Sequence, residues 1–89
     1  MTKYVFASKN VKSGNFNVPQ LYDFDKDSAK EAFEISMKET PAAGVEAVKE
    51  LEIYYLGEFD TKSGLFSNNE PEYIVSGLEV LGNGQKCWS

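Results

Sequence analysis

LEIYYLGEFDTKSGLF, residues 51–66, contains the most strand-like segment of the chain. Every second residue from Leu51 to Tyr55 is apolar, and the latter half of the segment is apolar on both faces, which is typical of a central strand. Asp60 occupies the first position of a turn, and Gly64 stands where a positive φ is needed. The segment therefore predicts a strand that folds back through a tight turn into a hairpin.

A second hairpin is predicted at the N-terminal end. Residues 3–8 alternate, with Tyr4 and Phe6 on one face, and residues 10–15, NVKSGN, have the composition of a turn. The returning segment contains Pro19, which has no N–H to donate to a neighbouring strand. We expect a short second strand at an edge of the sheet.

The segment DFDKDSAKEAFEISMKETP, residues 23–41, predicts the main helix. Ser28 and Glu31 have the spacing of a capping box, Asp25 and Asp27 lie near the positive end of the helix dipole, and Pro41 ends the helix. One arc of the helical wheel is suited to packing on a sheet. Its members are Ala29, Ala32, Phe33, Ser36 and Met37.

These elements predict an α+β fold. We expect a small antiparallel sheet of about four strands, arranged as two hairpins, with one main helix packed on one face. Residues 41–50 fit a short helix or an irregular approach to the next strand, residues 67–72 have the polar composition of a linker, and residues 71–81 fit a strand or a helical turn. We find no internal repeat, and expect one domain over residues 1–89 with a flexible tail over residues 82–89.

The composition excludes several classes of function. The chain has 89 residues and a formal net charge of −5, with no histidine, no arginine and a single cysteine, Cys87. Histidine is the commonest metal ligand and acid–base group, and arginine is the usual reader of phosphate and guanine. We therefore expect no enzymatic activity, no cofactor and no metal site. No apolar run approaches the roughly 20 residues that span a bilayer, so we expect no membrane role and a place in the cytosol.

The charge is distributed unevenly. Residues 1–22 contain three lysines and no acid, whereas residues 23–89 contain six lysines and fourteen acids. Lysines that contact phosphates and rings that stack on bases are the elements of sequence-independent single-stranded DNA binding. The candidate residues are Lys3, Lys9, Lys12 and Phe16, with Tyr54 and Trp88 as further rings for stacking. Because side chains alternate along a strand, Lys3 and Lys9 should lie on one face of the predicted strand, and Tyr4 and Phe6 on the other.

A structural interpretation of the same residues stays open. Tyr4 and Phe6 are typical core residues, and lysines on an edge hairpin prevent unwanted pairing of sheets. Taken alone, the residues favour this interpretation, because a negative net charge opposes the approach of a polyanion. Trp88 either packs back on the domain or contacts a partner. We also expect a homodimer, since a small domain with an edge strand and surplus rings gains core by pairing.

The block YYLGEFDTKSG resembles a small nonstructural protein of gokushoviruses, which are single-stranded DNA phages of the Microviridae. The matching residues are Tyr54, Leu56, Gly57, Glu58, Phe59, Asp60, Ser63 and Gly64, with further matches at Ala29, Phe33, Pro71, Tyr73 and Ile74. The resemblance implies a phage accessory protein that is absent from the capsid. It also implies DNA binding during single-stranded genome synthesis or packaging in the host cytoplasm.

A second class of function stays open beside DNA binding. An acidic adaptor would bind a phage or host replication protein, or a procapsid protein, through the charged face of the main helix and the Trp88 tail. Binding to DNA depends on Lys9 and Lys12 and weakens with salt, whereas an adaptor is indifferent to both.

Overall fold

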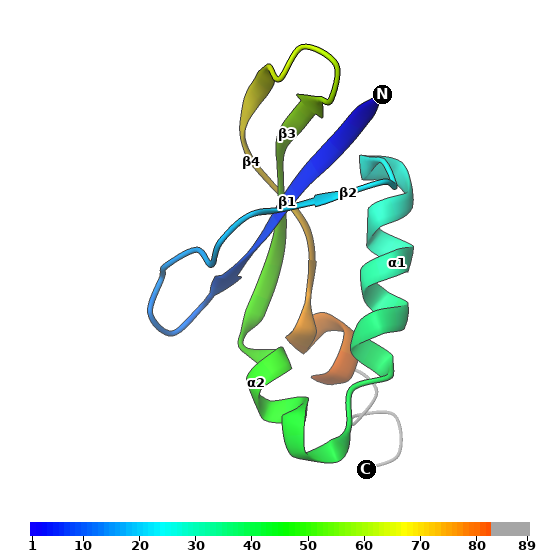
Figure 1. Cartoon of the computed structure of the whole chain (residues 1–89). Coiled ribbons are helices and arrows are strands. Elements are labelled where there is room, and N and C mark those ends of the chain that lie inside the picture. The colour runs from blue at the N-terminus through cyan, green and yellow to red at the C-terminus, as the bar shows by residue number, and fades with distance from the viewer. Residues whose placement is uncertain (83–89) are drawn as a thin grey trace.

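Four antiparallel strands form the sheet of the computed structural model, which describes residues 1–82 (Figure 1). The strands are β1 (Thr2–Asn10), β2 (Gln20–Tyr22), β3 (Leu51–Asp60) and β4 (Phe66–Ser76), and their order in the sheet is β2-β1-β3-β4. This arrangement confirms the two predicted hairpins and the short edge strand, although β2 begins only after Pro19 and the preceding part of the returning segment forms an isolated bridge at Phe16. Each hairpin contributes its first strand to the centre of the sheet, where β1 and β3 pair along their whole length.

Helix α1 (Lys26–Lys38) covers one face of the sheet, as predicted (Figure 1). The segment that fitted either a helix or an irregular approach is helical, with a 3-10 turn at Ala42–Gly44 followed by α2 (Val45–Lys49). After β4 the chain forms a π-helical turn over Leu78–Gly82. Apart from Gly82, the tail that was expected to be flexible lies outside the described residues.

The core lies between α1 and the sheet. Phe6 is 1% exposed, and its ring lies 5.4 to 5.7 Å from four neighbouring rings. These rings are Tyr22, Phe24, Phe33 and Tyr55. Edge-to-face and tilted contacts of this kind add to the free energy gained from burial alone. The alternation predicted for β1 is therefore confirmed, with Phe6 facing the helix.

Two details of the sequence analysis were wrong. The N-cap of α1 is Asp25, whose carboxylate accepts a hydrogen bond of 2.9 Å from the backbone N–H of Ser28. The predicted capping box began three residues too late, because Asp25 and Ser28 are both good N-cap residues. In addition, residues 67–72 are part of β4 and not a linker. Pairing with β3 holds them extended despite their low strand propensity.

A close approach between β3 and β4 requires glycine at position 57. Gly57 has a φ of 148°, and a Cβ built on it would lie 1.9 Å from the carbonyl oxygen of Ser67. Next to Gly57, the register of β3 shifts in its pairing with each of its two neighbouring strands. In the pairing with β1, the shift falls between Val5 and Phe6. Irregularities of this kind bend and twist a strand.

The other face of the sheet carries no helix within residues 1–82. We call it the open face; on it alternation places side chains from all four strands and from the segment before β2. Its members are Lys3, Val5, Ala7, Lys9, Phe16, Leu21, Glu52, Tyr54, Leu56, Phe59, Phe66, Asn68, Tyr73 and Ser76. Several of these rings and aliphatic side chains are exposed, so the open face is an apolar surface with lysines among its members.

Candidate nucleic-acid interface

Four side chains lie next to one another at one end of the open face. Lys9 of β1 faces Phe16 across an isolated bridge, and Tyr54 of β3 pairs with Tyr73 of β4. The Phe16 and Tyr54 ring centroids are 5.3 Å apart, and those of Tyr54 and Tyr73 are 6.0 Å apart. We call these four residues the ring row. Strand register brings together three of the residues predicted from the sequence, although they lie as far apart as positions 9 and 54.

Hydrogen bonds hold the two tyrosines of the ring row in place. The Tyr54 hydroxyl donates to Glu52 Oε1 at 2.9 Å, and the Tyr73 hydroxyl donates to Glu79 Oε1 at 2.7 Å. The bond to Glu52 and partial burial raise the pKa of Tyr54, while burial and then Glu79 raise the pKa of Tyr73. Both hydroxyls are therefore uncharged at neutral pH, and the rings present neutral surfaces.

Lys9 is the cation of the ring row. Its Nζ lies 5.6 Å from the centroid of Phe16 and 5.9 Å from that of Tyr54, and it has no carboxylate partner among residues 1–82. An exposed contact between an ammonium group and a ring contributes about 0.5–1 kcal/mol, whereas a base stacked on a ring contributes about 1–3 kcal/mol. A base can therefore replace the ammonium group on the ring, which leaves the lysine free for a phosphate.

The other two candidate lysines are neutralised, contrary to the expectation of an acid-free basic hairpin. Lys3 forms an ion pair with Asp23, and Lys12 Nζ lies 2.8 Å from Glu50 Oε2. The Glu50 carboxylate raises the pKa of Lys12, and the Lys12 ammonium lowers the pKa of Glu50. Both acids lie outside residues 1–22 in sequence, and folding brings them to the hairpin. Since exposed ion pairs contribute little to stability, a phosphate can compete for these lysines.

An apolar groove of about 470 Å³ lies in the middle of the open face. Val5, Leu21 and Leu56 line it, and Phe66 lies at its rim, 60% exposed. The sequence analysis did not identify Phe66, Phe59 or Tyr73 as candidates. The places of Phe66 and Tyr73 follow from the course of β4, part of which was expected to be a linker, and that of Phe59 follows from the register shift of β3 beside Gly57.

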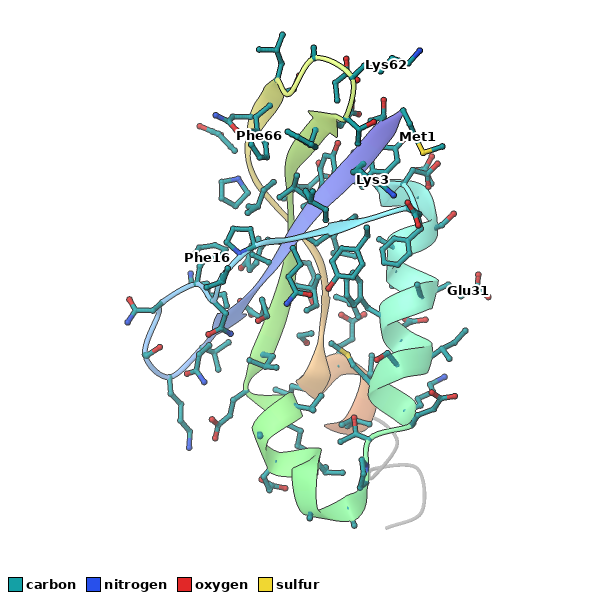
Figure 2. All side chains as sticks on the ribbon, viewed as in Figure 1. Met1, Lys3, Phe16, Glu31, Lys62 and Phe66 are labelled. Atoms are coloured by element: carbon teal, nitrogen blue, oxygen red, sulfur yellow. The ribbon has the colours of Figure 1, made fainter. Side chains whose placement is uncertain are left out.

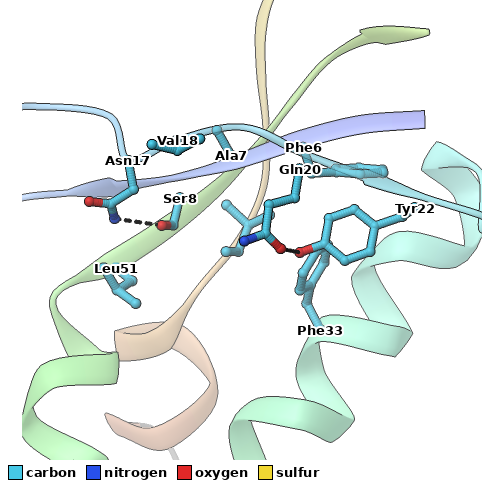
Figure 3. Close-up of a pocket in the computed structure, with 10 residues that line it drawn as sticks. Phe6, Ala7, Ser8, Asn17, Val18, Gln20, Tyr22, Phe33 and Leu51 are labelled. Atoms are coloured by element: carbon cyan, nitrogen blue, oxygen red, sulfur yellow. Dashed lines mark hydrogen bonds between the residues drawn. The ribbon is translucent and has the colours of Figure 1, made fainter. Parts of the chain in front are cut away.

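A second hollow, of about 250 Å³, lies beside the short strand β2 (Figure 3). Its polar groups bind one another. The Asn17 amide donates to Ser8 Oγ at 2.7 Å, and the Tyr22 hydroxyl donates to Gln20 Oε1 at 3.3 Å. These pairs occupy the groups that would otherwise recognise a polar ligand, so this hollow adds nothing to the candidate interface.

The remaining candidate, Trp88, lies outside the described residues. Within residues 1–82, no group of three or more histidine, cysteine, aspartate or glutamate side chains is placed to hold a metal ion. No helix in the same range is long and apolar enough to cross a membrane.

Comparison with known proteins gives one match. The family described as Phage ORF5 protein matches residues 3–80, which include both hairpins, α1 and the ring row. No curated protein and no solved structure matched the chain. Because the match extends over most of its length, the chain belongs to the family described as Phage ORF5 protein.

Proposed function

We propose that this phage protein is a non-catalytic accessory protein that binds single-stranded DNA without sequence preference through the ring row. The observation that carries the proposal is the position of Lys9, an unpaired cation among described residues that lies over Phe16 and Tyr54. Rings that stack on any base and a lysine that meets any phosphate give affinity without base recognition. Phe16 is 42% exposed and Tyr73 45% exposed, so both rings are accessible.

The charges of the ring row and its neighbours support weak binding. Lys9 is available at once, whereas Lys3 and Lys12 must leave Asp23 and Glu50 to reach a phosphate. With one to three phosphates neutralised, the logarithm of the binding constant falls with the logarithm of salt concentration with a slope of roughly −0.7 to −2. This slope is shallow compared with that of a basic DNA-binding protein.

Fluorescence anisotropy of a labelled oligodeoxythymidine tests the proposal. Lys9→Gln and Phe16→Ala should each weaken binding about fivefold or more, because one removes the free cation and the other a stacking ring. Lys9→Glu combined with Lys12→Glu should abolish it. Lys38→Gln is the matched control, since Lys38 is an exposed lysine of α1 without a carboxylate partner among the described residues. Equal losses in Lys9→Gln and Lys38→Gln would contradict a role for the ring row.

The proposal extends to the group of phages that encodes the protein. We propose a gokushovirus origin, on the strength of the block from Tyr54 to Gly64, with a role in genome synthesis or packaging in the host cytoplasm. A measured preference for single-stranded over double-stranded DNA of equal length supports that role. Equal affinity for both forms would argue against stacking on splayed bases.

An acidic adaptor is the second candidate function. It is favoured by the pairing of Lys3 and Lys12 with carboxylates, which reduces the positive potential of the first hairpin. Glu31 lies on the outer side of α1, away from the sheet (Figure 2). An adaptor predicts that Glu31→Lys impairs the protein during infection, whereas Lys9→Gln does not. It also predicts no saturable DNA binding at any salt concentration.

A further inference from the structure

The two hairpins contain the same turn, which the sequence analysis missed when it found no internal repeat. The first turn, residues 10–15, and the phenylalanine after it read NVKSGNF; the second turn, residues 60–65, and its phenylalanine read DTKSGLF. They share the sequence Lys-Ser-Gly-x-Phe and begin with Asn10 or Asp60. These residues are common in turns, so a match over five positions is easily overlooked. The hydrogen bonds show that the two segments also have the same conformation.

The two turns are held by equivalent hydrogen bonds. Asn10 Oδ1 accepts from the backbone N–H of Lys12 at 2.9 Å, and Asp60 Oδ1 accepts from that of Lys62 at 3.0 Å. Gly14 and Gly64 each donate 2.8 Å bonds to the carbonyl of the residue that begins the turn. Both glycines have a positive φ, of 77° and 76°. The sheet therefore presents one structural unit twice.

Each turn places a phenylalanine on the open face beside a ring of β3. Phe16 contacts Tyr54 at 5.3 Å, and Phe66 contacts Phe59 at 4.7 Å between centroids. Tyr54 and Phe59 pair with Ala7 and Lys3, which are four residues apart on β1 because the register shifts beside Gly57. At a rise of roughly 3.4 Å per residue, the two rings are separated by about 14 Å along the sheet. Because β1 and β3 are antiparallel, the two turns lie at different ends of the sheet (Figure 1).

The second turn also presents an unpaired cation. Lys62 extends from the tip of the second hairpin (Figure 2) and has no carboxylate partner in the described part of the chain. The equivalent lysine of the first turn is Lys12, which is paired with Glu50, and the unpaired cation of the ring row is Lys9 on β1. Between the two ring pairs lies the apolar groove lined by Val5 and Leu56. The open face thus has a ring pair at each end, with Lys9 at one of them and the turn that bears Lys62 next to the other.

We propose that the second turn is a second subsite for single-stranded DNA, formed by Phe59, Lys62 and Phe66, and that one strand runs along the open face between the two ring pairs. This inference rests on the proposed function of the ring row. A spacing of about 14 Å corresponds to about four nucleotides at the 3.4 Å rise of a stacked strand, and to fewer in an extended one. Two observations support DNA as the occupant: the groove lies on the same face as the ring row, and Lys9 and Lys62 have no carboxylate partner among the described residues.

Oligomer length distinguishes one subsite from two. A dinucleotide of deoxythymidine is too short to bridge the two ring pairs, whereas a dodecanucleotide reaches both. Joining two weak contacts on one strand raises affinity through the effective concentration of the second contact. Wild-type protein should therefore bind the dodecamer at least about tenfold more tightly than the dinucleotide.

Two double variants and one control complete the experiment, which uses anisotropy of the labelled oligomers. Lys62→Gln with Phe66→Ala should weaken dodecamer binding about tenfold but change dinucleotide binding by no more than about twofold, because the ring row remains. Lys9→Gln with Phe16→Ala should lower dodecamer affinity similarly. Leu65→Ala is the matched control, because this side chain is 70% exposed and lines a different hollow with Glu58. Circular dichroism of each variant verifies folding.

The outcomes separate this inference from the function on which it rests. A normal dodecamer affinity in the Lys62→Gln and Phe66→Ala variant, with a loss in the Lys9→Gln and Phe16→Ala variant, overturns the second subsite and leaves the ring row. Failure of the wild-type protein to bind either oligomer overturns the proposed function, and the subsite with it. Sedimentation that shows a wild-type dimer dissociated by Phe66→Ala overturns the subsite, because a second copy of the chain would cover this face.

Discussion

Replacement of two phenylalanines by alanine should separate the stability of this fold from its proposed binding surface. Phe6 is 1% exposed and contacts four rings, whereas Phe66 is 60% exposed and contacts Phe59 at 4.7 Å. A buried Phe→Ala change costs about 3–5 kcal/mol, and the loss of one ring pair costs about 0.5–1.5 kcal/mol. At about 0.05–0.15 kcal/mol per residue, a chain of this length has a free energy of unfolding of about 4–13 kcal/mol. Phe6→Ala therefore removes a large share of it, and Phe66→Ala a small one.

Urea denaturation followed by far-ultraviolet circular dichroism measures both changes. The midpoint for Phe6→Ala should fall much further than that for Phe66→Ala, with similar slopes. Phe6→Leu, which keeps part of the buried volume, serves if Phe6→Ala does not fold. If the midpoints of the two alanine variants fell equally, the core could not lie between α1 and the sheet while the open face is exposed to solvent. A midpoint that depends on protein concentration for the wild type but not for Phe66→Ala would show that a second copy covers the open face, as the expected homodimer requires.

Gly57→Ala should destabilise the protein by about 2 kcal/mol or more in urea denaturation, because φ is 148° and the added Cβ meets the Ser67 carbonyl oxygen. Asp25→Ala should cost about 1 kcal/mol in the same assay through loss of the α1 N-cap, whereas Ser28→Ala should cost less. Backbone and side-chain hydrogen bonds in the second turn lower the pKa of Asp60. Its contribution to stability is therefore present above the unfolded pKa of about 4 and lost as pH falls through the lower folded value. Thermal unfolding of Asp60→Asn should accordingly depend less on pH below about 4 than that of the wild type.

The elements with a clear periodicity could be predicted from the sequence, and those held by pairing could not. Phe6 and the apolar face of α1 follow the periods of a strand and a helix, so local spacing was sufficient. The part of β4 over residues 67–72 has asparagine, glutamate and proline in place of strand formers, and only its pairing with β3 makes it a strand. For the same reason, Phe66 and Tyr73 were assigned to separate segments.

The candidate interface could be predicted in composition but not in geometry. Strand parity correctly separated Lys9 from Phe6, and that follows from the sequence alone. The contact between Phe16 and Tyr54 depends on the register of β1 against β3, which the sequence did not specify. The Lys12 ammonium is neutralised by Glu50, the C-cap residue of α2, which lies far along the chain from the first hairpin. Charge counted by sequence position therefore overstated the positive potential of the first hairpin.

The distance between the two sides of the sheet explains how a chain of net charge −5 can present a surface for a polyanion. Glu31 lies on the outer side of α1, and packed layers of a protein are separated by about 10 Å. Its carboxylate is therefore more than one Debye length, about 8 Å at physiological salt, from the open face. Under these conditions a strand on the open face interacts mainly with the charges of that face, which include Lys9 and also Glu52, the residue opposite Lys9 in the register of β1 and β3. At about 0.01 M salt the Debye length reaches about 30 Å, which exceeds the two shorter dimensions of the molecule, 25 and 20 Å. The net negative charge of the whole chain then reduces the gain in affinity that low salt gives to contacts between lysines and phosphates, so the salt dependence should be shallower than the number of phosphate contacts alone predicts.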